Sequence, residues 1–230
     1  MSILYVVATP IGNLEDISLR ALRILGEVKL IAAEDTRKTR RLLSAYDIRT
    51  PLTSYHEHSN EAKLDYLLEY LENEDLALVS EAGMPGLSDP GYELIVAAIG
   101  AGVSVVPVPG ASAVITALVV SGLPTDQFLY VGFLPRRKGQ RRSLLSSIAD
   151  ERRTIVAFET PHRLIEALSD IEDVLGNRRV SVCRELTKVH EEVFRGRVSQ
   201  GREHFMEPRG EFSLVIEGKT RAWVKSQERS

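Results

Sequence analysis

The stretch Leu76-Ala-Leu-Val-Ser-Glu-Ala-Gly-Met-Pro-Gly-Leu-Ser-Asp-Pro-Gly91 joins an apolar run to a loop with three glycines and two prolines in twelve residues. The apolar run, residues 76–79, predicts a buried strand. Glycine permits positive φ and close approach by a ligand, whereas proline fixes φ and removes a hydrogen-bond donor. We therefore expect the loop to have a fixed shape at the end of this strand, where shaped loops often bind a ligand.

Three more loops of this kind follow apolar runs, at residues 9–12, 33–37 and 107–112. The carboxyl ends of parallel strands meet at one edge of a sheet, and ligands collect at that edge in open α/β sheets. The four loops together therefore predict one shared binding site. Taken singly, each has a plainer reading: Pro109-Gly110 can be a turn, and Glu34-Asp35 can cap the helix that follows.

Strand and helix patterns alternate along the first half of the chain, which predicts a mainly parallel sheet. The expected strands are residues 4–8, 30–33, 76–80 and 103–108, and the expected helices are residues 17–28, 60–71, 92–100 and 111–120. The helix over 111–120 has almost no polar residue, so we expect it to be buried on several sides.

The pattern restarts after the loop Ser121–Asp126, where we expect a domain boundary. Strands are expected at residues 128–133, 154–158, 180–184 and 212–217, and helices at residues 138–149 and 161–175. The prediction is an α/β protein with an N-terminal domain over 1–122, a C-terminal domain over 123–220 and a charged tail over 221–230.

The composition, 43% hydrophobic and 27% charged over 230 residues, is typical of a globular protein. No apolar run approaches the roughly 20 residues of a membrane span, and the N-terminus reads directly into a strand without a signal peptide. The single cysteine, Cys183, excludes an internal disulfide and a cysteine metal cluster. We expect a cytoplasmic protein with no membrane partner and no metal.

Several common site motifs are missing from the sequence. The loop after the first strand has one glycine where a dinucleotide fingerprint needs three, and no phosphate-loop lysine motif occurs. Zinc-ligand spacing and a Gly-x-Ser-x-Gly elbow are missing as well. These absences argue against NAD or FAD enzymes, nucleotide triphosphatases and common hydrolases.

Two basic runs interrupt a chain whose net charge is −3: four basic residues in five over Arg37–Arg41, and five in seven over Arg136–Arg142. Each can be a solvated face or a phosphate-binding patch. In the second half, Phe158–Arg163 and Cys183–Lys188 place polar and charged side chains where a strand ends. A helix N-terminus disfavours cations, so we expect Arg163 to face an anion.

These segments, in order, resemble the tetrapyrrole-methylase superfamily, the class III S-adenosylmethionine methyltransferases, and within it the members that methylate ribosomal RNA. The matching segments run through nearly the whole chain: residues 7–17, 33–38, 80–91, 106–113, 133–135, 158–163, 183–188 and 210–213. Where the superfamily has Gly-Asp-Pro, this chain has Gly83-Met84-Pro85. The departure at Met84 implies that backbone groups bind the methyl donor there.

The resemblance implies S-adenosylmethionine (SAM) bound in a cleft between the two α/β domains, a homodimer, and 2′-O-methylation of the ribose of a decoding-centre cytidine in 16S rRNA. The partner would be 16S rRNA or the small ribosomal subunit. Members of this family commonly carry a small helical extension. Because this sequence ends soon after its expected last strand, we expect an intact donor site and weaker RNA docking.

The resemblance also implies roles for particular residues. The donor would contact Pro10, Gly83, Met84, Pro85, Leu87, Pro109, Gly110, Ala111, Ser112, Phe158, Glu159 and Ser213. A general base would come from Asp35, Glu81, Asp89 and Glu159, with Arg37, Arg163 and Lys188 positioning phosphate or orienting those acids. The residues expected to bind RNA backbone are Arg136, Arg137, Lys138, Arg141 and Arg142.

Two other functions remain open on the sequence. The same fold could methylate a small molecule such as a tetrapyrrole, although the two basic runs argue mildly against it. Alternatively, the loops could serve only as phosphate nests in a non-enzymatic anion-binding module.

Overall fold

The computed structural model describes residues 2–220. They divide into two compact units between Ser112 and Ala113, which we call unit 1 and unit 2. The charged tail expected over residues 221–230 lies outside the described residues. Among residues 2–220, no helix has the length and apolar character that a membrane span requires.

Unit 1 is built on a five-stranded sheet with the order β3-β2-β4-β1-β5, and every pairing in it is parallel. The parallel sheet predicted for this half is confirmed. Its strands are β1 (Ile3–Val7), β2 (Leu30–Ala33), β3 (Leu52–Ser54), β4 (Leu76–Val79) and β5 (Ser104–Val108). The edge strand β3 was not predicted, because its three residues carry no clear period.

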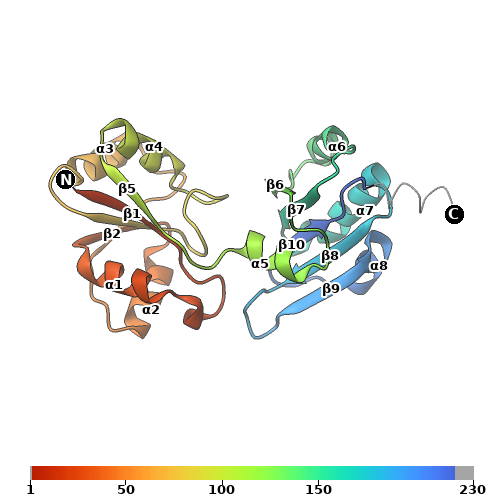
Figure 1. Cartoon of the computed structure of the whole chain (residues 1–230), viewed down its shortest axis with the longest axis horizontal. Coiled ribbons are helices and arrows are strands. Elements are labelled where there is room, and N and C mark those ends of the chain that lie inside the picture. The colour runs from red at the N-terminus through yellow and green to blue at the C-terminus, as the bar shows by residue number, and fades with distance from the viewer. Residues whose placement is uncertain (1, 221–230) are drawn as a thin grey trace. The chain divides into compact units, whose positions relative to one another are not determined.

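Helices cover both faces of this sheet (Figure 1). Residues on alternate faces of the strands separate into two cores, one shared with α1 (Leu19–Glu27) and α2 (Thr36–Ala45), the other with α3 (Glu61–Tyr70) and α4 (Tyr92–Gly100). Val7, for example, packs on the first pair of helices and its neighbour Val6 on the second. The central strands are therefore apolar on both faces, as parallel strands usually are.

Unit 2 contains a second five-stranded sheet with the order β6-β7-β10-β8-β9. Its strands are β6 (Phe128–Phe133), β7 (Thr154–Glu159), β8 (Arg179–Arg184), β9 (Glu192–Arg197) and β10 (Phe212–Ile216). Only β6 and β7 are parallel, and the pairings of β7 with β10, β10 with β8, and β8 with β9 are antiparallel. This sheet is therefore mixed, because β10 is antiparallel to both of its neighbours and β9, which the sequence did not predict, forms a hairpin with β8.

One face of the second sheet packs against α6 (Lys138–Ser147), α7 (Leu164–Leu175) and α8 (Val198–His204) in a single core. Helix α5 (Ala113–Val120) contacts β7 and β10 instead, and its buried residues lie outside that core. Helix α5 belongs to unit 2, since the division between the units lies between Ser112 and Ala113. The expectation that α5 is buried on several sides is wrong, because Ile115 is 48% and Val119 63% exposed.

Strand β6 contains a bulge beside β7. Tyr130 pairs with Val156 and Phe133 pairs with Phe158, so β6 uses one residue more than β7 between these pairs. Gly132 lies in this interval with φ of 69°, a conformation that favours glycine. An extra residue reverses the alternation of side chains along a strand, and Phe133 consequently lies on the same face as Tyr130.

Candidate functional site

The loops after β1, β2, β4 and β5 meet at the carboxyl edge of the sheet in unit 1. The loops after β1 and β4 are joined by a backbone bridge, in which Thr9 N donates to Gly83 O at 2.8 Å and Gly83 N donates to Thr9 O at 3.0 Å. Gly83 has φ of 83°, so the bridge depends on a conformation that L-residues rarely adopt. The structure thus brings together the loops that the sequence singled out.

The loop after β5 lies close to the loops after β1 and β4. A Cβ atom added to Gly110 would lie 2.9 Å from the Cβ of Ala8, and one added to Gly83 would lie 3.8 Å from Ala111 O. Pro109 and Gly110 are exposed, while Pro10, Ala111 and Ser112 are partly exposed. Small residues therefore let backbone from three loops approach one place, which is what a donor held by backbone groups requires.

Met84 and Leu87 take different positions in the loop after β4. Met84 packs partly against the core shared by α3 and α4, whereas Leu87 is 42% exposed. Pro85 is buried beside Gly91, where a Cβ on the glycine would lie 3.5 Å from the proline ring. Met84, which stands where the superfamily motif has aspartate, therefore packs partly against the core and does not present a charged group.

Asp35 caps α2. Its Oδ1 accepts hydrogen bonds from Arg37 N at 2.8 Å and Lys38 N at 3.2 Å. These backbone bonds hold the pKa of the Asp35 carboxyl below its usual range. Arg37 is exposed and its Nε lies 3.7 Å from Asp35 Oδ1. The geometry therefore gives Asp35 a structural role, since a carboxylate that prefers to stay ionised is a weak proton acceptor.

Glu81 connects the loops after β2 and β4. Its backbone N–H donates to Glu34 Oε2 at 3.0 Å, and its side chain forms an ion pair with Lys38. Glu34 was not among the predicted site residues, although its position beside Asp35 after a buried strand was a usable signal. Glu81 remains exposed, so its carboxylate is accessible to a substrate.

Asp89 follows a residue with unusual backbone geometry. Ser88 has φ of 61°, a left-handed conformation that costs a non-glycine residue about 1 kcal/mol. Gly86 N donates to Pro90 O at 3.2 Å, which closes the loop around this position. Asp89 is partly exposed within this closed turn.

In unit 2, Glu159 lies at the end of β7 and is only 1% exposed. Its Oε1 accepts from Thr160 N at 2.7 Å and lies 2.7 Å from Arg163 Nη2, while Oε2 is buried with no hydrogen-bond partner among residues 2–220. Burial raises the pKa of the Glu159 carboxyl, against the opposing effects of Thr160 and Arg163. The anion that Arg163 faces is therefore an internal one.

The neighbouring candidates of unit 2 divide between surface and interior. Phe158 is partly exposed and pairs across the sheet with Ser213, which is 6% exposed. Lys188 Nζ contacts Glu185 Oε1 at 2.9 Å and Glu211 Oε2 at 2.8 Å. Lys188 therefore closes a turn between two carboxylates.

The basic run after β6 has two parts. Arg136, Arg137 and Lys138 are exposed. Arg141 is completely buried, with Nη2 2.7 Å from Asp170 Oδ2. The expectation that Arg141 contacts RNA is therefore corrected: its charge is neutralised inside the protein.

Arg142 is also held by carboxylates. Its Nη1 lies 3.0 Å from Asp170 Oδ1 and 2.8 Å from Asp173 Oδ2, and its side chain is 38% exposed. Burial alone would raise the pKa of Asp170, but hydrogen bonds from Arg141 and Arg142 hold it below its ordinary value. Arg142 can reach phosphate only by giving up these partners.

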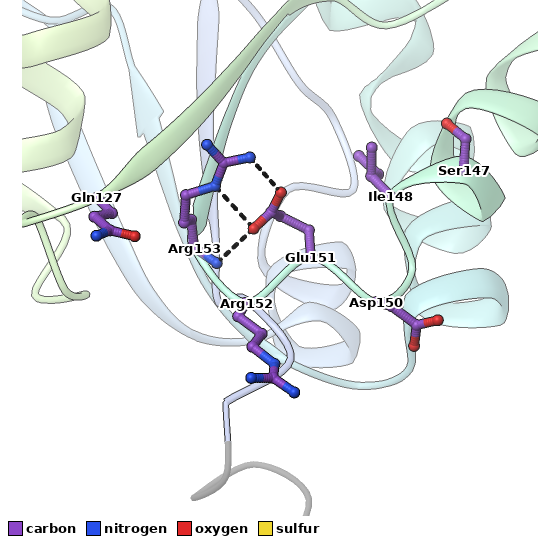
Figure 2. Close-up of a pocket in the computed structure, with 7 residues that line it drawn as sticks. All are labelled: Gln127, Ser147, Ile148, Asp150, Glu151, Arg152 and Arg153. Atoms are coloured by element: carbon purple, nitrogen blue, oxygen red, sulfur yellow. Dashed lines mark hydrogen bonds and ion pairs between the residues drawn. The ribbon is translucent and has the colours of Figure 1, made fainter.

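A hollow of ≈ 440 Å³ lies elsewhere in unit 2, around the turn between α6 and β7 (Figure 2). It is lined by Gln127, Ser147, Ile148, Asp150, Glu151, Arg152 and Arg153. Glu151 and Arg153 neutralise each other through bonds of 2.6 and 2.9 Å. This hollow adjoins the amino end of β7, away from Phe158 and Glu159, and contains no predicted site residue. Within residues 2–220, no cluster of three His, Cys, Asp or Glu side chains could hold a metal ion.

Comparison with known proteins agrees with the fold. The family model described as Tetrapyrrole (Corrin/Porphyrin) Methylases matches residues 3–200. Among solved structures, uroporphyrin-III C-methyltransferase from Thermus thermophilus, complexed with S-adenyl homocysteine, has a TM-score of 0.67 at 19% identity, over 94% of this chain and 97% of that one. A diphthine synthase has a TM-score of 0.68 at 14% identity, over 94% of this chain and 90% of its own.

The chain therefore belongs to the tetrapyrrole methylase family, and it is a methyltransferase. Its close relatives share one name, Ribosomal RNA small subunit methyltransferase I. The relative from Halalkalibacterium halodurans is 53% identical over 94% of this chain and 75% of its own length. That from Thermotoga maritima is 49% identical over 95% of this chain and all of its own, and that from Bacillus subtilis is 46% identical over 99% and 79%.

Proposed function

We propose that this chain transfers a methyl group from SAM to the ribose 2′-oxygen of a decoding-centre cytidine in 16S rRNA. The observation that carries the proposal is the shared name of relatives 46–53% identical over 94–99% of the chain. At 19% identity, the likeness to a porphyrin methylase supports the fold alone and does not favour a tetrapyrrole substrate. The substrate would be 16S rRNA or the small ribosomal subunit, and the protein would then act in the cytoplasm.

The loops of unit 1 fit a methyl donor held by backbone groups. Gly83 and Gly110 let the backbones of these loops lie close together. A Cβ at Gly110 would obstruct this approach, because it would lie 2.9 Å from the Cβ of Ala8. We assign donor binding in unit 1 to Pro10, Gly83, Met84, Pro85, Leu87, Pro109, Gly110, Ala111 and Ser112. In unit 2 we assign it to Phe158, Glu159 and Ser213. When bound, SAM supplies an electrophilic methyl carbon on a sulfonium.

The chain must position the ribose hydroxyl and accept its proton. In-line displacement needs the attacking oxygen held in alignment, and a 2′-hydroxyl becomes a good nucleophile only as its proton is removed. Glu81 and Asp89 are the carboxylates we propose as the base. Both are accessible to a substrate, since Glu81 is exposed and Asp89 partly exposed, whereas Glu159 is 1% exposed and Asp35 holds the first backbone N–H groups of α2.

The cationic candidates have supporting roles in this proposal. Arg37 is exposed beside Asp35 and can contact phosphate. Arg163 orients Glu159, and Lys188 holds Glu185 and Glu211. Arg136, Arg137 and Lys138 would bind the RNA backbone, a contact that weakens with salt. We also propose a homodimer, to which the exposed Ile115 and Val119 of α5 contribute.

The test is mass-spectrometric mapping of 2′-O-methyl groups on 16S rRNA from cells that lack the gene, complemented with wild type, Glu81→Gln or Asp89→Asn. We expect one methylated cytidine to disappear without the gene and to return with wild type. The variant that lacks the base should lose 10²- to 10⁴-fold in methylation rate, as removal of a general base does. Calorimetry should show that it still binds SAM.

An identical modification pattern with and without the gene would contradict the proposed substrate. Full activity of both variants would instead place the base elsewhere. Purified wild-type protein that gives no heat with SAM would contradict the donor assignment and favour an anion-binding module.

A further inference from the structure

Three aromatic rings form a row on one face of the second sheet, which we call the aromatic row: Tyr130, Phe158 and Phe133. Phe158 is the middle ring, with its centroid 5.4 Å from that of Tyr130 and 5.4 Å from that of Phe133. Both contacts are edge-to-face. Phe133 ends the row and is 51% exposed, so part of its ring meets solvent.

The bulge in β6 places Phe133 in this row. Val131 packs against the core shared with α6 to α8, and so does Leu134. Regular alternation from Val131 would turn Phe133 toward the same helices. The extra residue at Gly132 turns it to the opposite face beside Phe158. The chain therefore departs from regular strand geometry at the point where it exposes an aromatic ring.

The segment that follows Phe133 is fixed from two sides. Leu134 N donates to Phe158 O at 3.2 Å, and Leu134 O accepts from Arg163 Nη1 at 3.1 Å. The buried Arg141 donates from Nη1 to Pro135 O at 3.4 Å and to Arg136 O at 3.5 Å. Arg141 and Arg163 thus position this segment although neither is free to bind a ligand.

Three exposed cations follow immediately: Arg136, Arg137 and Lys138. None of the three has an ion pair with a carboxylate among the salt bridges of residues 2–220. A fixed, half-exposed aromatic ring beside exposed cations is the combination that binds single-stranded nucleic acid, because every base has a face that stacks and every nucleotide a phosphate.

We infer that Phe133 is the stacking platform for an unpaired base of the substrate RNA, with Arg136, Arg137 and Lys138 holding the adjacent phosphates. The inference rests on the proposed function and adds to it a residue that recognises the nucleotide. The sequence signal was the segment Phe133-Leu-Pro135, which carried the resemblance but received no role of its own. A protein partner would also cover an aromatic ring, but it has no general need for three cations beside it.

The test measures binding of the full chain to small ribosomal subunits from cells lacking the gene, together with KM and kcat for methyl transfer. Phe133→Leu keeps the apolar bulk and removes the stacking face. We expect it to weaken subunit binding and raise KM about tenfold, on the scale measured for single base–aromatic contacts, and to leave SAM binding unchanged. Phe133→Tyr keeps an aromatic ring and should therefore have wild-type subunit binding and KM.

The matched control is Tyr66→Leu. Tyr66 is 46% exposed and has Lys63 Nζ 4.6 Å from its ring centroid, so it too is an exposed aromatic beside a cation, but it lies on α3 outside the proposed site. We expect wild-type binding and kinetics for this variant. Gly132→Ala supplies a second route, since strain at the bulge should misplace Phe133 and raise KM without altering the ring.

Wild-type affinity and KM in Phe133→Leu, with wild type active, would overturn the inference and leave the proposed function standing. A changed oligomeric state in Phe133→Leu with unchanged subunit affinity would overturn it in favour of a protein interface. If wild-type protein neither bound nor methylated the subunits, the proposed function itself would fail.

Discussion

Glu151 shows how strongly a single contact can change a carboxyl group. Its two oxygens accept hydrogen bonds from the backbone N–H, Nε and Nη2 of Arg153, at 2.9, 2.9 and 2.6 Å. The side-chain bonds from Arg153 are the main reason that its pKa falls to about 2. A carboxyl group whose pKa is lower in the folded protein stabilises the fold only while it is ionised.

Glu151→Gln should therefore destabilise the protein at neutral pH and not at very low pH. The stabilising effect of Glu151 is complete above its ordinary pKa of 4.5 and disappears as the pH falls toward about 2. We expect a loss of about 1 kcal/mol at pH 7, because Arg153 is 44% exposed and solvent screens the pair.

Urea unfolding of wild type and Glu151→Gln at pH 7, 4 and 2.5 checks this expected pH dependence. Glu207→Gln is the control, since Glu207 is 88% exposed and 4.0 Å from Arg209. A deficit in Glu151→Gln that stays constant across the three pH values would contradict the assignment.

Helix α4 begins from a backbone position that only glycine fits well. Gly91 precedes the helix with φ of 132°, and a Cβ there would lie 3.0 Å from Leu78 Cδ2 and 3.3 Å from Gly86 N. The loop that carries Asp89 must end at this point. The start of α4 therefore determines how the loop is closed as well as where the helix lies.

Gly91→Ala should destabilise the protein by about 2 kcal/mol, because it adds both backbone strain and crowding. The matched substitution is Gly26→Ala in α1, where a Cβ meets nothing within 4 Å and φ is ordinary. Alanine there should stabilise the helix by about 0.5 kcal/mol. Equal effects in the two variants, measured by thermal unfolding, would show that Gly91 is not conformationally required.

At the scale of the whole molecule, no hydrophobic core is shared between the units: unit 1 has two, one on each face of its sheet, and unit 2 has one. The core of unit 2 also contains an ion pair, since Arg141 is completely buried and Asp170 is 2% exposed. Removing one member of a buried pair leaves the other without compensation and typically costs about 3 kcal/mol or more. Loss of this pair should lower the stability of unit 2 and leave that of unit 1 unchanged.

Asp170→Asn should thus increase hydrogen exchange in β7, β8 and β10 and leave exchange in β1, β2 and β4 unchanged. Asp173→Asn is the control, because Asp173 is 54% exposed and its bond to Arg142 is a surface contact. Hydrogen exchange followed by mass spectrometry separates the two units. Faster exchange in both units of Asp170→Asn would show that their stabilities are coupled.

The sequence predicted unit 1 well because its parallel strands are apolar on both faces and its loops carry glycine and proline at the strand ends. It predicted unit 2 less well. Two of its antiparallel pairings join β10 to β7 and to β8, a strand direction that the alternating pattern does not reveal. The third joins β8 to β9, which carries Arg195 and Arg197 and lacks a clear period. The bulge at Gly132 and the burial of Arg141 were not visible either, because both depend on what packs against them in three dimensions.

Cys183 is the single cysteine of the chain and is 1% exposed in β8. Burial raises the pKa of its thiol, so little thiolate forms at neutral pH. Cys183 should therefore react little with thiol-specific labels, and it need not be replaced before a second cysteine is introduced for labelling. A cysteine introduced at Arg137 would take up a maleimide fluorophore without removal of the native residue, and its emission could follow RNA binding in real time, with a label at Tyr66 as the control outside the proposed site.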